Sequence, residues 1–305
     1  MAENPPALRP GDPVMLVSPS GPTRPERVAR GIELLTEWGL EVRTAPNVFA
    51  RAGYLAGTDE QRLDDLNLAL RDPEIRGVLC TRGGYGAQRI VDGVNLAAVR
   101  ADPKVVVGFS DITALQLALW RRANLATVHG PGAAWLDERT GPESAESLRR
   151  AIMTDAPVLI HAREDEETSG IRMGGTAEGT LLGGNLCLLT SSVGTADFPD
   201  LRGAILLLEE VAEPPYKVDR MLLHLRRAGV LSGLAGVALG QFNDCADDWP
   251  ISIVDVLTEH LSTWGVPVLG GLPIGHGKDQ LTVPLGVPAL LDPAVGILTA
   301  GSAVR

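Results

Sequence analysis

One serine, Ser110, has the sequence context of a catalytic nucleophile. The apolar run 105–107 predicts a strand that ends just before it, and a helix is predicted over 111–123. A serine on a tight strand-to-helix turn projects from the sheet edge, where the helix N-terminus offers N–H groups to an oxyanion. The pattern G-x-S-x-G is only half met, because Ile112 stands where the second glycine is expected. Serine is also a favoured helix N-cap, so both interpretations stay open.

A glycine-rich loop, 81–86, follows the predicted strand 77–80. Its three glycines would let backbone N–H groups approach a ligand closely. The order of residues fits neither G-x-G-x-x-G nor a Walker loop, so an oxyanion or a carboxylate suits it better than a polyphosphate. Arg82 in this loop is a candidate clamp for a substrate carboxylate, and the alternative is a structural ion pair. An ordinary strand-to-helix turn is the alternative for the loop as a whole.

The candidates for a base and an acid lie far apart in the sequence. His276 stands between two glycines after the predicted strand at 268–269, and His129 is its rival because it also follows a strand. No two histidines have metal-ligand spacing, so we expect no metal site. Glu209 directly follows the apolar run 204–208. It is either a functional acid or a buried ion-pair partner of Lys217 or Arg220.

The elements that must position these residues alternate between strands and helices, which predicts βαβ units around a parallel sheet. Ligands of such sheets collect beyond the carboxyl ends of the strands. We therefore expect an α/β fold, with a first domain over 1–155, a linker over 156–175 and a smaller mixed α/β domain over 176–305. The charged run 163–167 is interpreted as solvated loop. The expected strands are 14–17, 77–80, 105–108, 126–128, 204–208 and 237–239, with short ones in 282–298, and the expected helices are 24–38, 58–70, 111–123, 217–228 and 253–264.

Composition narrows the class of protein. The chain has 305 residues and a formal net charge of −11, which disfavours nucleic acid and anionic membrane as partners. Its three cysteines are far apart, so a disulfide framework is not expected. The first residues lack the pattern of a signal peptide, and the apolar runs are too short to span a bilayer. A cytoplasmic location is therefore expected.

Taken together, six motifs resemble the LD-carboxypeptidases of serine peptidase family S66, which includes muramoyl-tetrapeptide carboxypeptidases and the microcin C self-immunity peptidase. The resemblance covers about residues 12 to 300. The motifs are Ser18-Pro19-Ser20-Gly21, Thr81-Arg82-Gly83-Gly84-Tyr85-Gly86, Gly108-Phe109-Ser110-Asp111, Gly183-Gly184-Asn185-Leu186, Leu208-Glu209-Glu210 with Pro215-Tyr216-Lys217-Val218-Asp219-Arg220, and Gly275-His276.

The resemblance implies a flavodoxin-like N-terminal domain that carries a serine nucleophile and a C-terminal domain that supplies the rest of a Ser-Glu-His triad. Carried over, Ser110 is the nucleophile, His276 the general base and acid, and Glu209 the residue that orients the imidazole. The N–H groups of Asp111 and Gly84 would form the oxyanion hole. Substrate contacts are expected from Arg82, Ser20 and Asn185. The resemblance also implies a homodimer that needs no cofactor.

Three functions follow as hypotheses. The first is hydrolysis of the L,D-peptide bond before the terminal D-Ala of murein tetrapeptides, in peptidoglycan recycling. The second keeps the triad but cleaves an aminoacyl-nucleotide amide, as in the microcin branch, with Trp135 or Trp249 as the platform for adenine. The third is a binding module that holds peptide without cleaving it.

Overall fold

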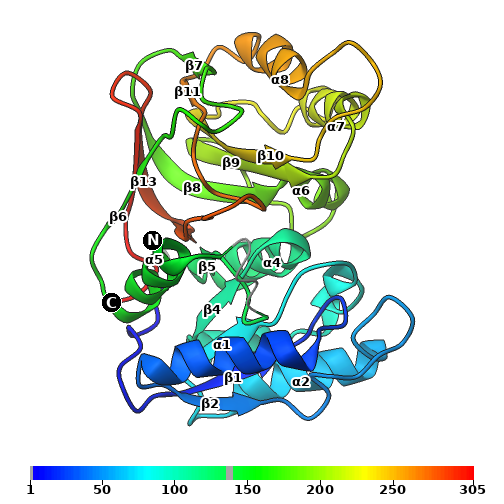
Figure 1. Cartoon of the computed structure of the whole chain (residues 1–305), viewed down its shortest axis with the longest axis vertical. Helices are drawn as coiled ribbons and strands as arrows, with labels where there is room; N and C mark the ends of the chain where they lie inside the picture. The colour runs from blue at the N-terminus through cyan, green and yellow to red at the C-terminus, as the bar shows by residue number, and fades with distance from the viewer. Residues whose placement is uncertain (1–2, 135–139) are drawn as a thin grey trace.

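The computed structural model describes residues 3–134 and 140–305. This part of the chain forms two α/β domains, which appear as the lower and upper lobes of Figure 1. The predicted two-domain α/β class is confirmed. No helix among the described residues is both long and apolar enough to cross a membrane.

The N-terminal sheet has the strand order β12-β5-β4-β3-β1-β2. Its five consecutive strands run parallel in the order 2-1-3-4-5, which is the flavodoxin-like order, and β12 adds an antiparallel edge. The strands are β1 (Pro13–Val17), β2 (Glu41–Thr44), β3 (Gly77–Cys80), β4 (Val105–Gly108), β5 (Thr127–His129) and β12 (Val283–Leu285).

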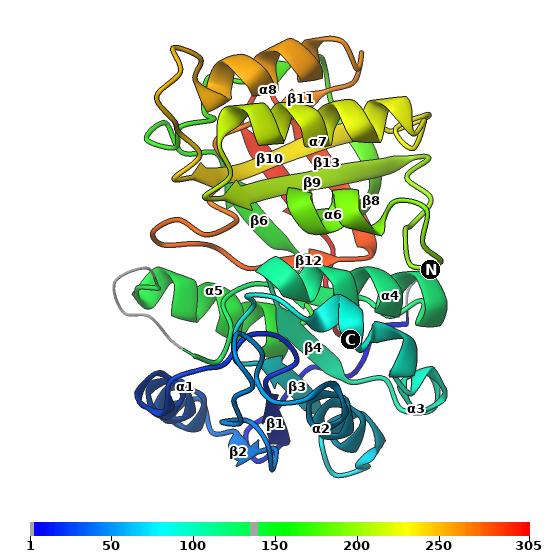
Figure 2. The same cartoon turned by 90° about the vertical axis from the view of Figure 1, so that its right-hand side faces the viewer.

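Helices cover both faces of this sheet, and Figure 2 shows α1 and α2 on opposite sides of it. The alternation of strand side chains explains the two layers. In β1, Val14 and Leu16 pack toward α1 and α5, whereas Met15 and Val17 pack toward α2, α3 and α4. The helices are α1 (Pro25–Glu37), α2 (Asp59–Arg71), α3 (Leu96–Ala101), α4 (Thr113–Ala123) and α5 (Pro142–Met153).

The C-terminal sheet is mixed and has the order β6-β14-β13-β8-β9-β10-β11-β7. Strands β8 to β11 are parallel, and the remaining pairs are antiparallel. Helices α6, α7 and α8 pack on one face through an apolar cluster of their own. The elements are β6 (Val158–His161), β7 (Arg172–Met173), β8 (Ala177–Asn185), α6 (Leu186–Ser192), β9 (Ala204–Val211), α7 (Pro215–Arg227), β10 (Gly236–Asn243), α8 (Ile253–Ser262), β11 (Val268–Leu269), β13 (Val287–Asp292) and β14 (Ile297–Ala300).

The two domains share one apolar core. In β9, Leu206 and Leu208 face the helices of the second domain, whereas Ile205 and Leu207 belong to a cluster that also contains Val14 of the first domain. Helix α4 lies at the junction in both views and contacts α6 and β8. Apolar packing is therefore continuous across the junction of the two domains.

The structure differs from the expected domain division in two places. Segment 156–175 is not a free linker, because it contributes β6 and β7 to the C-terminal sheet, where they pair with β14 and β11. Its Thr168 is buried and donates to the Gly240 carbonyl at 3.1 Å. In the other direction, β12 leaves the C-terminal segment to pair with β5 of the N-terminal sheet. The sheet of the C-terminal domain has eight strands and the sheet of the N-terminal domain has six, so the expected smaller domain has the larger sheet.

Candidate active site

Ser110 lies on the turn between β4 and α4, as the sequence predicts. Its φ is +62°, a left-handed conformation that costs energy for a residue with a side chain and that persists where the surroundings impose it. A short 3-10 turn, Ser110–Ile112, precedes α4. The cap positions of the turn and of the helix are Phe109 and Ile112, and neither makes a side-chain capping bond. Ser110 is therefore not the helix N-cap that the alternative interpretation required.

The loops that follow β1, β3 and β4 contact one another and surround Ser110. The Asp111 carboxylate accepts hydrogen bonds from Ser20 Oγ at 2.6 Å and from the Ala87 N–H at 2.8 Å. Gly83 packs so closely that a Cβ built there would lie 2.6 Å from Ser110 Cβ and 2.8 Å from Ser110 Oγ. The position of the hydroxyl thus depends on contacts from all three loops.

His276 and Glu209 form a hydrogen-bonded pair supplied by the C-terminal domain. The distance from His276 Nδ1 to Glu209 Oε2 is 2.6 Å, and the Glu209 side chain is fully buried. Burial alone would raise the pKa of Glu209, but the charge and hydrogen bond of His276 hold it below its usual value. An ionised carboxylate only accepts, so Nδ1 donates and Nε2 is the nitrogen left for proton transfer.

The loop that carries His276 is anchored on both sides. Gly275 has a φ of +145°, and a Cβ there would lie 3.0 Å from Glu209 Oε2, so glycine permits the close approach to the acid. On the other side, Gln241 Oε1 accepts the Gly277 N–H at 2.8 Å. Gln241 Nε2 in turn donates to Glu166 Oε1 at 2.7 Å. This support comes partly from the charged run that the sequence had suggested to be solvated.

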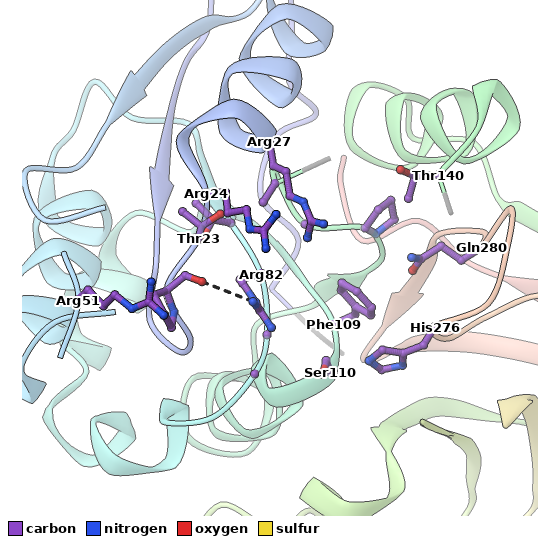
Figure 3. Close-up of a pocket in the computed structure, with 17 residues that line it drawn as sticks. Thr23, Arg24, Arg27, Arg51, Arg82, Phe109, Ser110, Thr140, His276 and Gln280 are labelled. Carbon is purple, nitrogen blue, oxygen red and sulfur yellow. Dashed lines mark hydrogen bonds between the residues drawn. The ribbon is translucent and has the colours of Figure 1, made fainter. Parts of the chain in front are cut away.

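Ser110 and His276 line the same cavity, of about 650 Å³, between the two domains. Figure 3 shows the two side chains next to each other on one wall, below Phe109. The ring centroids of Phe109 and His276 are 4.8 Å apart. Gly84 and Arg82 also line the cavity, and Arg82 Nη1 lies 3.4 Å from the Pro22 carbonyl. The structure thus brings a serine, a histidine and a buried acid to one place.

The rival histidine, His129, has a different environment. It is fully buried at the end of β5 and does not line the cavity. Burial lowers the pKa of His129 to about 4, so the ring is neutral at ordinary pH. Within the described structure, neither ring nitrogen has a hydrogen-bond partner. His276 is therefore the histidine placed to act on Ser110.

The two cations that were possible ion-pair partners of Glu209, Lys217 and Arg220, interact with other residues. Lys217 pairs with Glu213 at 3.0 Å, and Arg220 lies over the Tyr216 ring, 5.6 Å from its centroid. Glu209 instead faces His276, so the alternative of a structural pair with Lys217 or Arg220 is not what the structure shows.

Several expected contact residues lie apart from the cavity lining. Ser20 is buried and binds the Asp111 carboxylate. Asn185 is buried and donates to Glu210 Oε1 at 2.9 Å. Both side chains brace the loops, and direct contact with substrate by either stays a prediction. Trp249 is 72% exposed and lies outside the lining, whereas Trp135 falls outside the described residues.

Three further arginines of the lining went unnoticed in the sequence: Arg24, Arg27 and Arg51. Arg24 is the N-cap residue of α1, and Arg27 lies in its first turn. A cation at a helix N-terminus opposes the helix dipole, and this local conflict was the available signal. Across the described residues, no three His, Cys, Asp or Glu side chains group as metal ligands would.

Comparisons with known proteins agree with this geometry. A family model for the LD-carboxypeptidase N-terminal domain matches residues 14–130, and one for the C-terminal domain matches 178–291. A candidate carboxypeptidase of Streptomyces coelicolor is 43% identical over 97% of this chain and 95% of its own length. The murein tetrapeptide carboxypeptidase of Pseudomonas aeruginosa is 33% identical over 92% of both chains.

A solved structure is similar over nearly the whole chain. The muramoyltetrapeptide carboxypeptidase of Oxalobacter formigenes superposes with a TM-score of 0.83 and 29% identity, covering 96% of this chain and 100% of that one. The two family models together span both domains described above. The chain therefore belongs to the LD-carboxypeptidases of serine peptidase family S66.

Proposed function

We propose that this protein hydrolyses the L,D-peptide bond before the terminal D-Ala of murein tetrapeptides. The family is one of serine carboxypeptidases, and a relative with 33% identity is named a murein tetrapeptide carboxypeptidase. The observation that carries the proposal is the 2.6 Å pair of His276 and Glu209 beside a serine in a left-handed conformation. A neutral serine needs an adjacent base to act as a nucleophile, and this cavity supplies one.

Each residue of the triad has a defined role in the proposed reaction. Ser110 Oγ attacks the carbonyl carbon while His276 Nε2 takes its proton, and Glu209 stabilises the imidazolium that forms. The tetrahedral intermediate then collapses: the C–N bond breaks, and His276 returns the proton to the amine of the departing D-Ala. Water next attacks the acyl-enzyme while His276 takes its proton. The ester bond to Ser110 then breaks, and His276 returns that proton to Ser110 Oγ.

The oxyanion of each intermediate requires donors on the cavity side of Ser110. We assign the N–H groups of Asp111 and Gly84 to this role, because Asp111 follows the nucleophile and Gly84 lines the cavity. One such donor is worth about 3–4 kcal/mol of barrier reduction in serine hydrolases. Arg82, which lines the same cavity, is assigned to the terminal carboxylate of the substrate.

The test is the release of D-Ala from a murein tetrapeptide by the purified protein. We expect release by the wild type and none above background by Ser110→Ala. A serine-directed covalent probe should label Ser110, and His276→Ala should abolish the labelling, which a pure binding module would not show. Faster turnover of an aminoacyl-nucleotide amide than of the tetrapeptide would favour the other branch of the family.

The setting of the reaction is part of the proposal. We assign it to recycling of murein fragments in the cytoplasm, by a homodimer, as the family resemblance implies. Light scattering coupled to size exclusion would measure the mass in solution, and a mass of about 32 kDa would contradict the dimer.

A further inference from the structure

The proposed reaction gives no role to His129, the histidine that lies behind the cavity wall. Its side chain is fully buried at the end of β5, and neither ring nitrogen has a hydrogen-bond partner among the described residues. A buried polar group without a partner costs free energy, and nearly all such groups in folded proteins are hydrogen-bonded. An apolar side chain of similar size would avoid that cost. The imidazole therefore requires a partner to explain it.

The acid of the triad also has a buried atom without a partner. Glu209 Oε2 lies 2.6 Å from His276 Nδ1, whereas Glu209 Oε1 has no hydrogen-bond partner in the described part of the chain. The Glu209 side chain has no exposed surface. An ionised carboxylate has only acceptors, and leaving one of them buried without a donor costs more than it would for a neutral group. The second oxygen of Glu209 therefore needs a donor from a neighbouring element.

The end of β8 lies next to both of these groups. Asn185, the last residue of β8, pairs with Glu209 in the parallel register of β8 and β9. The preceding residue, Gly184, packs so closely against His129 that a Cβ built there would lie 3.4 Å from His129 Nδ1. Gly184 has a φ of +133°, which favours glycine. Its missing side chain thus lets His129, from the first domain, approach the sheet that carries the acid.

The aromatic contacts and the charges of the site agree with this placement. The ring of Phe109 lies edge-on to His129, with 6.3 Å between centroids, and contacts His276 at 4.8 Å. Burial lowers the pKa of His129 to about 4, the charge of Glu209 acts against that shift, and the charge of His276 adds to it. Within the described structure, these are the two charged groups that act on the ring. A neutral imidazole carries one donor and one acceptor.

We infer that His129 is a positioning residue for the acid of the triad, and that its ring donates a hydrogen bond to Glu209 Oε1 through one buried water. This inference rests on the triad of the proposed function and adds a fourth side chain to it. Nδ1 faces Gly184 and the Thr113 hydroxyl, because a Cβ at Gly184 would lie 2.7 Å from Thr113 Oγ1. We therefore assign the donor to Nε2. No direct bond links the two side chains in the described structure, and a bridging water is nearly as favourable as a direct bond.

A second hydrogen bond to Glu209 affects the triad in two ways. It fixes the plane of the carboxylate, so that Oε2 stays directed at His276 Nδ1. It also stabilises the negative charge of the pair while the imidazole of His276 is neutral. Without that donor, binding of a proton by the pair becomes more favourable, so the base loses its proton only at a higher pH. Loss of the hydrogen bond should therefore lower the rate and move the acid limb of the pH profile upward.

The experiment measures how fast a fluorophosphonate probe labels Ser110 between about pH 5 and pH 8, the range in which an imidazole titrates. His129→Leu should lower the maximal rate by about tenfold, as expected for one hydrogen bond to a charged group, and should move the acid limb upward by about one pH unit. His129→Gln, whose amide can donate from a similar position, should keep the wild-type limb and most of the rate. His224→Leu, which replaces an exposed histidine on α7, is the matched control and should change neither.

Three results would overturn the inference. An acid limb that stays in place in His129→Leu would show that the ring does not act on the pair. Equal losses in the leucine and glutamine variants would show that only the shape of the side chain matters. A loss that appears only where melting curves show unfolding at the assay temperature would mean a purely structural role.

A crystal structure of the wild type tests the same inference without any variant. A water within hydrogen-bond distance of both His129 Nε2 and Glu209 Oε1 would support it, and a dry contact between the two side chains would contradict it.

The labelling reaction separates this inference from the proposed function, because it needs the base but no peptide. If the His129 variants behave as expected while the wild type releases no D-Ala, the proposed peptide substrate is wrong and the role of His129 stands. If D-Ala is released but the acid limb of His129→Leu does not move, the positioning role fails alone. No labelling of wild-type Ser110 at any pH would contradict the triad, and this inference with it.

Discussion

Replacing Gly83 by alanine tests how tightly the nucleophile is positioned. The new Cβ would lie 2.6 Å from Ser110 Cβ, 2.8 Å from Ser110 Oγ and 3.0 Å from the Asp111 nitrogen. Carbon atoms in contact prefer a separation of about 3.5–4.0 Å, so Ser110 or the glycine loop must move by about 1 Å. Gly83 does not have a left-handed φ, so alanine brings a steric conflict without backbone strain.

A displacement of about 1 Å at a reacting atom costs roughly 100-fold in rate. That factor corresponds to about 2.7 kcal/mol of activation free energy. The same methyl group stands against the Asp111 N–H, which we assign to the oxyanion hole, so the loss should fall on kcat more than on KM. The cost in folding stability is that of an overpacked site, about 1–3 kcal/mol.

The assay is kcat/KM for D-Ala release, together with the melting temperature of each variant. Gly175→Ala is the matched control, because its added Cβ has no atom within 4 Å and its φ is not left-handed. If Gly83→Ala keeps kcat/KM within threefold of Gly175→Ala, then Ser110 is not positioned by this contact. A loss explained wholly by unfolding at the assay temperature would equally refute the argument.

Three more substitutions test other parts of the site. Glu209→Gln should lower kcat by about 10³–10⁴-fold, because a neutral amide no longer stabilises the imidazolium or fixes the tautomer of His276. Steady-state kinetics measure the effect, and a much smaller loss would contradict this role of Glu209. Ser20→Ala removes the 2.6 Å hydrogen bond to Asp111 and should lower kcat by about tenfold while KM stays nearly unchanged. A change in KM alone would contradict this prediction. His129 has a folded pKa of about 4 against about 6.5 unfolded, so the unfolded chain binds more protons between those values and stability falls as the pH drops. Between pH 7 and pH 5 the loss of folding stability is about 2 kcal/mol. His129→Leu should remove this loss from the pH dependence of urea unfolding. An unchanged pH dependence would show that another group is responsible.

The sequence predicted the elements whose patterns are local. The apolar runs before Ser110 and before the glycine loop are strands β4 and β3, and the flavodoxin-like order of the first domain follows the family resemblance. Strand β7 was missed because it is only two residues long, contains a charged residue and depends on a partner nearly a hundred residues away.

The candidate site was predictable in its reactive groups but not in its supports. The resemblance pointed to Ser110, Glu209 and His276. The structure places Ser110 and His276 on one cavity, with the buried Glu209 hydrogen-bonded to His276. The contact of Gly83 with Ser110 and the bond from Gln241 to the loop of His276 depend on tertiary packing, which no local pattern encodes. The only sequence signal for Arg24 and Arg27 was their position at the N-terminus of a predicted helix, where the helix dipole disfavours a cation.

The crossing of β12 into the first domain has a consequence for the newly made protein. This strand, Val283–Leu285, completes the N-terminal sheet but is synthesised long after the other five strands of that sheet. His276 precedes it by a few residues, so Ser110 is synthesised long before its base. Domains generally fold in the order of their synthesis. A nascent chain that stops short of this segment therefore holds Ser110 without its base, and the site is complete only once the segment that carries His276 and β12 has been made.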